Sequence, residues 1–238
     1  MNIITKLNFQ YISQWLRWRL GHQSEEGFWD RYLRTRGLRW QDEFNDRMNP
    51  DLELSQDLAA LLKNASPQSR VLDVGAGPLT IVGKKLFGVS IELTAVDPLA
   101  PQYNKLLAKH GLHPPVRTQA GKAEELTSLF ALNSFDLAHA RNCLDHGLDP
   151  YAAVQQMIRV VKPGGWVYLK HHPDEGIREQ WHGLHQWNFS RSAAGDFIIS
   201  SRQRELNVTK ALETVAAVTC EITEEKGEEW IIVRIQKK

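Results

Sequence analysis

The order of apolar and polar positions along the chain changes character near residue 66. From there, short β-branched runs alternate with stretches in which apolar residues recur every three or four positions, which is typical of a parallel sheet with crossover helices. The predicted strands are 70–74, 91–96, 116–119, 135–140 and 166–170, and the predicted helices are 79–87, 101–110, 123–129 and 151–161. We therefore expect a doubly wound α/β core.

The flanking segments have different patterns. Residues 24–65 are predicted to be helical, with a break at Asn49-Pro50, and residues 171–206 lose the alternation and become rich in histidine, tryptophan, glycine and serine. The chain ends in two apolar runs, 218–222 and 230–235, around the turn EEKGEE, which predicts an antiparallel hairpin. We expect a helical N-terminal arm or lid over 1–50 and one domain over 51–238, with the insertion 171–206 as a substrate lid.

Composition narrows the class of protein. The 238 residues carry 29 Lys and Arg against 28 Asp and Glu, so no strong positive field favours nucleic acid. Only Cys143 and Cys220 are present, and no signal peptide or membrane-spanning run is visible, which favours a cytoplasmic protein. An apolar stripe near the N-terminus fits packing on the domain better than a membrane surface; it consists of Ile4, Leu7, Tyr11, Trp15 and Trp18.

The stretch VLDVGAGPLT places a glycine loop at the end of the first predicted strand, where ligands of open parallel sheets bind. A dinucleotide loop would have a third glycine where Thr80 stands. Asp73 would repel a pyrophosphate but suits a positively charged ligand. Asp97 lies twenty residues beyond Gly77, the spacing at which an acid reaches ribose hydroxyls. The residues therefore indicate a cationic ligand with a ribose.

Five segments occur in an order and spacing that carry a family resemblance: VLDVGAGPLT, AVDPLA, GKAEEL, SFDLAHARNCLDH and VVKPGGWVYLK. Over about residues 66–170 they resemble the successive motifs of class I S-adenosylmethionine-dependent methyltransferases. The resemblance implies a Rossmann-like seven-stranded sheet, mostly parallel, completed by the C-terminal hairpin. It also implies S-adenosyl-L-methionine as cofactor and S-adenosyl-L-homocysteine as product, which suits a loop that favours a cationic adenosine.

The resemblance assigns roles to individual positions. Asp73, Gly75 and Gly77 would surround the methionine part of the cofactor. Asp97 would bind the ribose hydroxyls, and Ala123 with its neighbours would border the adenine. Lys122 stands where many members have an acid, so adenine recognition would use backbone groups or Glu124 instead. The full set of predicted cofactor contacts is Asp73, Gly75, Ala76, Gly77, Asp97, Pro98, Lys122, Ala123, Glu124, Arg141 and Asn142.

Histidines supply candidates for the base that accepts a proton from the methyl acceptor. His146 beside Asp145 and His171 after the fifth strand are predicted to be catalytic, against the alternative of hydrogen-bonded structural histidines. The histidines 171, 172, 182 and 185 lack a diagnostic metal-ligand spacing, so we predict no metal. The predicted substrate contacts are His172, His182, His185, Trp187, Trp29 and Tyr32.

The expected function is methyl transfer to an oxygen, rather than a nitrogen, of a small-molecule or glycan-like acceptor. Two alternatives stay open: an NAD-linked oxidoreductase on a similar sheet, and a non-catalytic partner protein that binds the cofactor. A nucleic-acid acceptor is disfavoured because ARNCLD stands where an Asn/Asp-Pro-Pro-aromatic segment would be expected. We expect no membrane span, and the sequence leaves a homodimer open.

Overall fold

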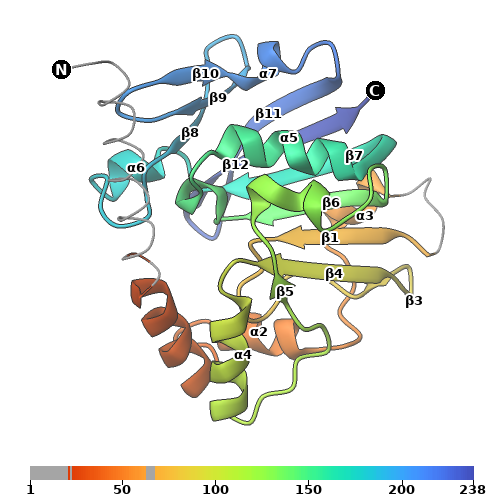
Figure 1. Ribbon diagram of the computed structural model, residues 1–238, viewed down its shortest axis with the longest axis vertical. Coiled ribbons are helices and arrows are strands. Elements are labelled where there is room, and N and C mark those ends of the chain that lie inside the picture. The colour runs from red at the N-terminus through yellow and green to blue at the C-terminus, as the bar shows by residue number, and fades with distance from the viewer. Residues whose placement is uncertain (1–20, 22, 63–67) are drawn as a thin grey trace.

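A seven-stranded sheet forms the centre of the computed structural model, which describes residues 21, 23–62 and 68–238. The strand order is β11-β12-β7-β6-β1-β4-β5; β12 pairs antiparallel with β7 and β11, and the other pairs are parallel (Figure 1). The predicted fold class is confirmed. The strands are β1 (Arg70–Val74), β4 (Glu92–Asp97), β5 (Gln119–Ala120), β6 (Phe135–Arg141), β7 (Val161–His171), β11 (Ala216–Glu225) and β12 (Glu228–Lys237).

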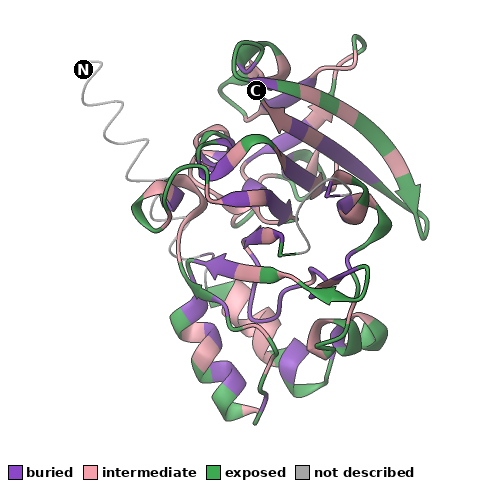
Figure 2. Cartoon of the chain, turned by 90° about the vertical axis from the view of Figure 1, so that its right-hand side faces the viewer, coloured by how far each residue is buried: buried purple, intermediate pink, exposed green. Residues whose placement is uncertain are grey.

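Helices cover both faces of this sheet. One face packs against α5 (Pro150–Val160), η1 (Ala123–Ser128) and α7 (Val208–Ala211), and the other against α3 (Gln56–Leu61). The predicted helix 151–161 matches α5 within one residue at each end, and Asp149 caps it by accepting the backbone N–H groups of Tyr151 and Ala152. Figure 2 shows buried segments concentrated in the sheet and in the helix faces turned toward it.

The predicted helix over 79–87 is wrong. This segment contains the β-branched residues Thr80, Ile81 and Val82, and it continues into a short hairpin of β2 (Lys85–Leu86) and β3 (Val89–Ser90). Main-chain bonds tie it to residues 52–54 instead: the N–H groups of residues 84 and 85 donate to the carbonyl of residue 52, and that of residue 54 donates to the carbonyl of residue 85. The glycine loop is therefore not followed by a helix.

The insertion 171–206 is more ordered than its composition predicts. It contains α6 (Glu175–Arg178) and a second, antiparallel sheet of β8 (Asn188–Arg191), β9 (Phe197–Ser200) and β10 (Glu205–Asn207). Trp187, Phe189 and Phe197 join the main apolar core. From β8 onward the insertion is thus part of the folded body, and its role as a substrate lid stays a prediction.

The N-terminal segment packs against the ligand end of the sheet. Residues 23–34 are helical, and together with α2 (Gln41–Met48) they share an apolar cluster with α4 (Ala100–Lys109), centred on Tyr32, Phe44 and Tyr103. The predicted stripe of residues 4–18 lies outside the described residues, and the boundary at residue 50 stays a prediction. Among the described residues, no helix has both the length and the apolar composition needed to span a bilayer.

Candidate active site

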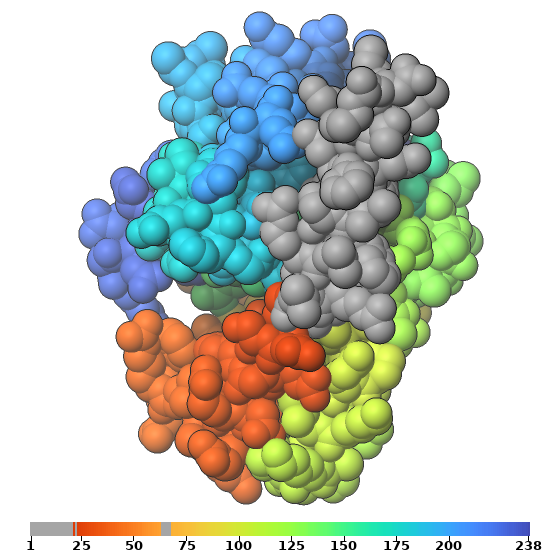
Figure 3. All heavy atoms as spheres, turned by 60° about the vertical axis from the view of Figure 1, so that its left-hand side comes forward, coloured from red at the N-terminus to blue at the C-terminus, as the bar shows by residue number. Residues whose placement is uncertain are grey.

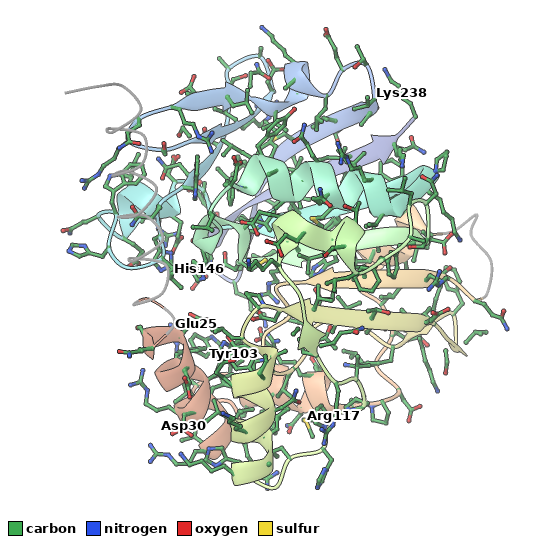
Figure 4. The ribbon with its side chains drawn as sticks, in the orientation of Figure 1. Glu25, Asp30, Tyr103, Arg117, His146 and Lys238 are labelled. Carbon is green, nitrogen blue, oxygen red and sulfur yellow. The ribbon has the colours of Figure 1, made fainter. Side chains whose placement is uncertain are left out.

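A cavity of about 450 Å³ lies where the carboxyl ends of β1, β4 and β6 meet. The helix of residues 23–34 and α2 form one side of it, and residues 184–185 of the insertion and β12 contribute to the other. Figure 3 shows an opening between the orange N-terminal segment and the teal insertion, and Figure 4 shows His146 and Glu25 on opposite sides of this region. The volume is that of a site for a small organic ligand.

The glycine loop forms the floor of the cavity and leaves no room for side chains. Gly75 and Gly77 have φ values of +69° and +63°, which favour glycine. A Cβ atom on Gly75 would lie 2.5 Å from the Cys143 side chain, and one on Gly77 would lie 2.6 Å from the Trp29 ring. Trp29, predicted to contact substrate, thus packs on the loop itself and lines the cavity.

Asp97 ends β4 as a buried carboxylate on the cavity wall. Its two oxygens accept the backbone N–H groups of Leu99, at 2.8 Å, and Gly77, at 3.1 Å. Burial raises the pKa of Asp97 to about 6, although these two hydrogen bonds lower it. Each carboxylate oxygen keeps a lone pair for a further donor, so the site suits the ribose hydroxyls predicted for this position.

Asp73 also lines the cavity, but its two oxygens are already engaged. His139 Nδ1 lies 2.7 Å from Oδ1, and the Thr80 hydroxyl donates to Oδ2 at 2.5 Å. His139 is buried and was not among the predicted site residues. The only signal for it in the sequence is a polar residue within an apolar strand, FDLAHAR. In this arrangement Asp73 fixes the loop, while the expectation that it attracts a cation remains untested.

The predicted adenine-side residues line the cavity too, with their charges partly engaged. Lys122 Nζ pairs with Glu125 at 2.9 Å on the surface. Glu124 Oε1 accepts the backbone N–H groups of Leu148, at 2.9 Å, and Asp149, at 3.2 Å. Glu124 therefore holds the loop after η2 (Leu144–His146) against η1.

Three side chains with acid-base chemistry gather at one end of the cavity. Asp145 is buried, and its Oδ2 lies 2.8 Å from His185 Nδ1 and 3.4 Å from His146 Nε2; both histidines line the cavity. Burial raises the pKa of Asp145, but His146 and His185 outweigh it and bring it to about 2. Burial lowers the pKa of His185, yet the hydrogen bond to Asp145 leaves it raised. Asp145 thus binds His185, forty residues away, more closely than its neighbour.

The same three residues have the ligand types of a metal centre, with candidate ligand atoms all within 4.8 Å of one another. Carboxylate and imidazole together bind several divalent ions. The prediction of no metal therefore stays untested.

Other predicted residues do not reach the cavity wall. His171 is buried against Phe189, at 4.7 Å between ring centroids, because its side chain enters the space that the second sheet fills. His182 is exposed and bonds the Glu179 carbonyl. Trp187 is buried and donates to the Gly147 carbonyl at 3.1 Å, because β8 carries it into the core.

The remaining predicted residues line other parts of the cavity. His172 packs on the Trp230 ring at 3.9 Å, and Asn142 Oδ1 accepts the His172 backbone N–H. Arg141 lies between Trp230 of β12 and Glu43 of α2, and Tyr32 lines the cavity from the helix of residues 23–34. Glu43 of α2 and Trp230 of β12 also line the cavity, although neither was predicted from the sequence; no local pattern marks either of them.

These features decide between the predicted cofactors. A pyrophosphate is bound well by the N-terminus of a helix that follows the glycine loop, and here that helix is absent. The loop, the free lone pairs of Asp97 and a cavity large enough for an adenosine with an amino-acid tail fit S-adenosylmethionine better. Gly75, Gly77, Asp97 and residues 122–124 would hold this cofactor.

Comparison with known proteins also indicates a methyltransferase. Residues 44–210 match the model of the family described as Methyltransferase domain. The chain is 35% identical over 120 residues to a ubiquinone biosynthesis O-methyltransferase of Bordetella avium, covering 50% of this chain and 47% of that protein. It is 33% identical over 103 residues to the protein of the same name from Xanthomonas oryzae pv. oryzae, covering 42% of each. The chain thus matches less than half the length of these relatives.

A solved structure shares the fold. The trans-methyltransferase CalH, in complex with S-adenosylhomocysteine, superposes with a TM-score of 0.53 at 12% identity, over 76% of this chain and 55% of that one.

Proposed function

The chain belongs to the methyltransferase domain family, and on this premise we propose that it transfers a methyl group from S-adenosylmethionine to a hydroxyl oxygen of a small-molecule acceptor. The predicted family is confirmed. The acceptor oxygen, the base and the residue roles belong to the proposal. The two bacterial relatives are named as O-methyltransferases, which supports oxygen as the acceptor atom.

The bound cofactor would supply an activated methyl group on a sulfonium. Because the leaving group departs neutral, the protein gains most by aligning the acceptor and removing its proton. Asp97, the glycine loop and the histidine cluster all line this cavity. Burial raises the pKa of Asp97, and His146 is close enough to that carboxyl to lower it in part. The cavity would hold the cofactor and the acceptor side by side.

The observation that carries the proposal is the Asp145–His185 pair on the cavity wall. Asp145 holds His185 by one ring nitrogen, which leaves Nε2 free to accept a proton from the acceptor hydroxyl. His146 packs edge-on against His185, with 4.6 Å between ring centroids, and restricts its rotation. We infer that His185 is the base, Asp145 orients it, and His146 positions it.

The test has two stages. Calorimetry with purified protein is expected to show binding of S-adenosylhomocysteine, and absence of binding would reject the proposal. Metabolite extracts incubated with methyl-labelled cofactor are then expected to yield a labelled ether detected by mass spectrometry. A labelled amine or saccharide would identify a different acceptor class, and binding without any labelled product would favour a non-catalytic partner protein.

A further inference from the structure

Arg141 brings a charge into the cavity from the end of β6, where one long ion pair is its closest contact with an acid. Its guanidinium lies 5.0 Å from the Trp230 ring centroid, and its nearest carboxylate, Glu43 Oε2, is 3.6 Å away. That distance exceeds a hydrogen bond, and no other described side chain accepts from it. Burial lowers the pKa of Arg141, although Glu43 raises it. Five donors on a half-buried cation are left without a close acceptor.

A second polar group without a regular hydrogen bond faces the same space. The Tyr32 side chain is 2% exposed and lines the cavity, and its hydroxyl has no partner at regular hydrogen-bond geometry among the described residues, although the Arg47 guanidinium is close enough to act on it as a donor. Burial raises the pKa of Tyr32 to about 12, and the charges of Arg47, Glu43 and Arg141 also act on it. The hydroxyl therefore belongs to the same electrostatic neighbourhood as Arg141. A buried donor left unpaired is costly, and a ligand acceptor would pair it.

Arg47 and Arg141 share one close carboxylate, Glu43. The other acids of this side are paired elsewhere: Glu228 with His172 at 3.5 Å and Glu225 with Lys170 at 2.5 Å. Glu43 Oε1 accepts two bonds from Arg47, at 3.1 Å from Nε and 2.9 Å from Nη2. One carboxylate thus faces two guanidinium groups, and it is closer to Arg47 than to Arg141. A second anion would complete the cluster.

The Arg141 side chain extends away from the glycine loop. The sheet order is β1, β6, β7, β12, so Trp230 stands three strands from the loop, or about 14 Å at the usual strand spacing. Arg141 starts on β6 and its guanidinium lies over the Trp230 ring, which means that it extends away from Gly75. It points to the side of the cavity left for the acceptor.

We propose that Arg141 and Tyr32 form an anion subsite for a carboxylate of the acceptor, so that the substrates are small hydroxylated organic acids. Arg141 donates to the carboxylate, Tyr32 adds one hydrogen bond, and Trp230 holds the guanidinium in place before binding. This subsite rests on the proposed function, because it assigns the non-cofactor part of the cavity to the acceptor.

Binding of matched acids and amides tests the subsite without turnover. Protein saturated with S-adenosylhomocysteine is titrated by calorimetry with benzoate and benzamide, 3,4-dihydroxybenzoate and its amide, and indole-3-acetate and its amide. Since a charge-assisted hydrogen bond is worth roughly 10- to 100-fold in affinity, we expect at least one acid to bind about 10-fold or more tightly than its amide. Arg141→Gln is expected to abolish this preference, and Tyr32→Phe to reduce it.

Lys170 offers a matched control. Its ammonium lies 5.0 Å from the same Trp230 ring, but it pairs with Glu225 at 2.5 Å and does not line the cavity. Lys170→Gln should therefore leave the acid preference unchanged. Thermal melting of each variant checks that it folds, and Tyr32→Phe should melt close to the unmodified protein because the lost hydroxyl has no protein partner at regular hydrogen-bond geometry among the described residues.

Three results would overturn the subsite. The first is the absence of acid preference in all three pairs, and the second is its persistence in Arg141→Gln. The third is weaker binding of S-adenosylhomocysteine in Arg141→Gln, which would assign the guanidinium to the cofactor's own carboxylate. Failure of methyl transfer, in contrast, would reject the proposed function while leaving an acid preference measurable.

Discussion

The Asp73 carboxylate on β1 and the His139 imidazole on β6 are cross-strand neighbours 2.7 Å apart, buried at the centre of the sheet. Because a carboxylate only accepts hydrogen bonds, His139 donates from Nδ1. Its ring stacks on Tyr168 of β7, at 5.9 Å and 13°, and the Tyr168 hydroxyl bonds Asp57 of α3 at 3.1 Å. The acid before the glycine loop is thus anchored through three strands to a helix on the sheet face.

Replacing His139 by phenylalanine should destabilise the protein and weaken cofactor binding. The variant keeps a stacking ring but leaves Asp73 with Thr80 as its one remaining side-chain partner, and loss of a buried partner costs about 2–4 kcal/mol. Urea unfolding measures the change. In a double-mutant cycle, Asp73→Asn should make the His139 substitution less harmful; equal effects in both backgrounds would show that the two side chains do not act together.

Cofactor affinity should depend on the ionisation of Asp97. Since its pKa is raised to about 6, the carboxylate is charged above that pH and takes up a proton below it. Only the charged form accepts from donors on both oxygens, so binding of S-adenosylhomocysteine should weaken as the pH falls from 7 to 5. Calorimetry across this range measures it. Asp97→Asn should bind about 10-fold or more weakly with a flat profile; an unchanged affinity would refute the ribose assignment.

The rate of methyl transfer should rise with pH through the pKa of His185. Its pKa is raised by Asp145, and only the neutral ring accepts a proton, so activity is low on the acid side. Asp145→Asn should move this rise to lower pH and reduce the plateau, and His185→Gln should lose about 100-fold or more. His182→Gln, an exposed histidine of the same insertion, is the control. Full activity in the His185 variant would show that His185 is not the base.

His171 should influence stability rather than activity. Both its ring nitrogens lack partners among the described residues, and burial lowers its pKa to about 3. Between pH 6.5 and 3 the unfolded chain therefore binds a proton that the folded chain does not, so stability falls as the pH falls through this range. His171→Leu should lessen this loss and raise stability by about 1 kcal/mol or more. Thermal melts at pH 5 and 7, with activity assays, test both statements.

The sequence predicted what depends on local order. A strand followed by a glycine loop places Asp73 at the sheet edge, and Asp97 follows from the next strand in the same way, since the carboxyl ends of parallel strands share one edge. The position of each acid can be predicted from its own strand and loop alone. Both residues lie on the cavity wall as that reasoning requires.

What the sequence did not predict depends on pairing between distant segments. The contact of His139 with Asp73 requires the register of β1 against β6, 66 residues apart. The helix expected over 79–87 is absent because residues 52–54 supply its hydrogen-bond partners. Among the histidines of the insertion, the path of the chain into β8 brings His185, and not His182, to Asp145.

The cavity wall formed by Trp29, Tyr32 and Glu43 matters for the design of truncated forms of this protein. These residues precede position 44, where the match to the family begins, and they line the cavity from the helix of residues 23–34 and from α2. A fragment trimmed to residues 44–210 would keep the five parallel strands but lose this wall, and it would also lose β11 and β12 with Trp230 on the other side of the cavity. Water would then enter beside the reacting groups. The fragment would therefore bind its ligands more weakly and less selectively than the 238-residue chain does.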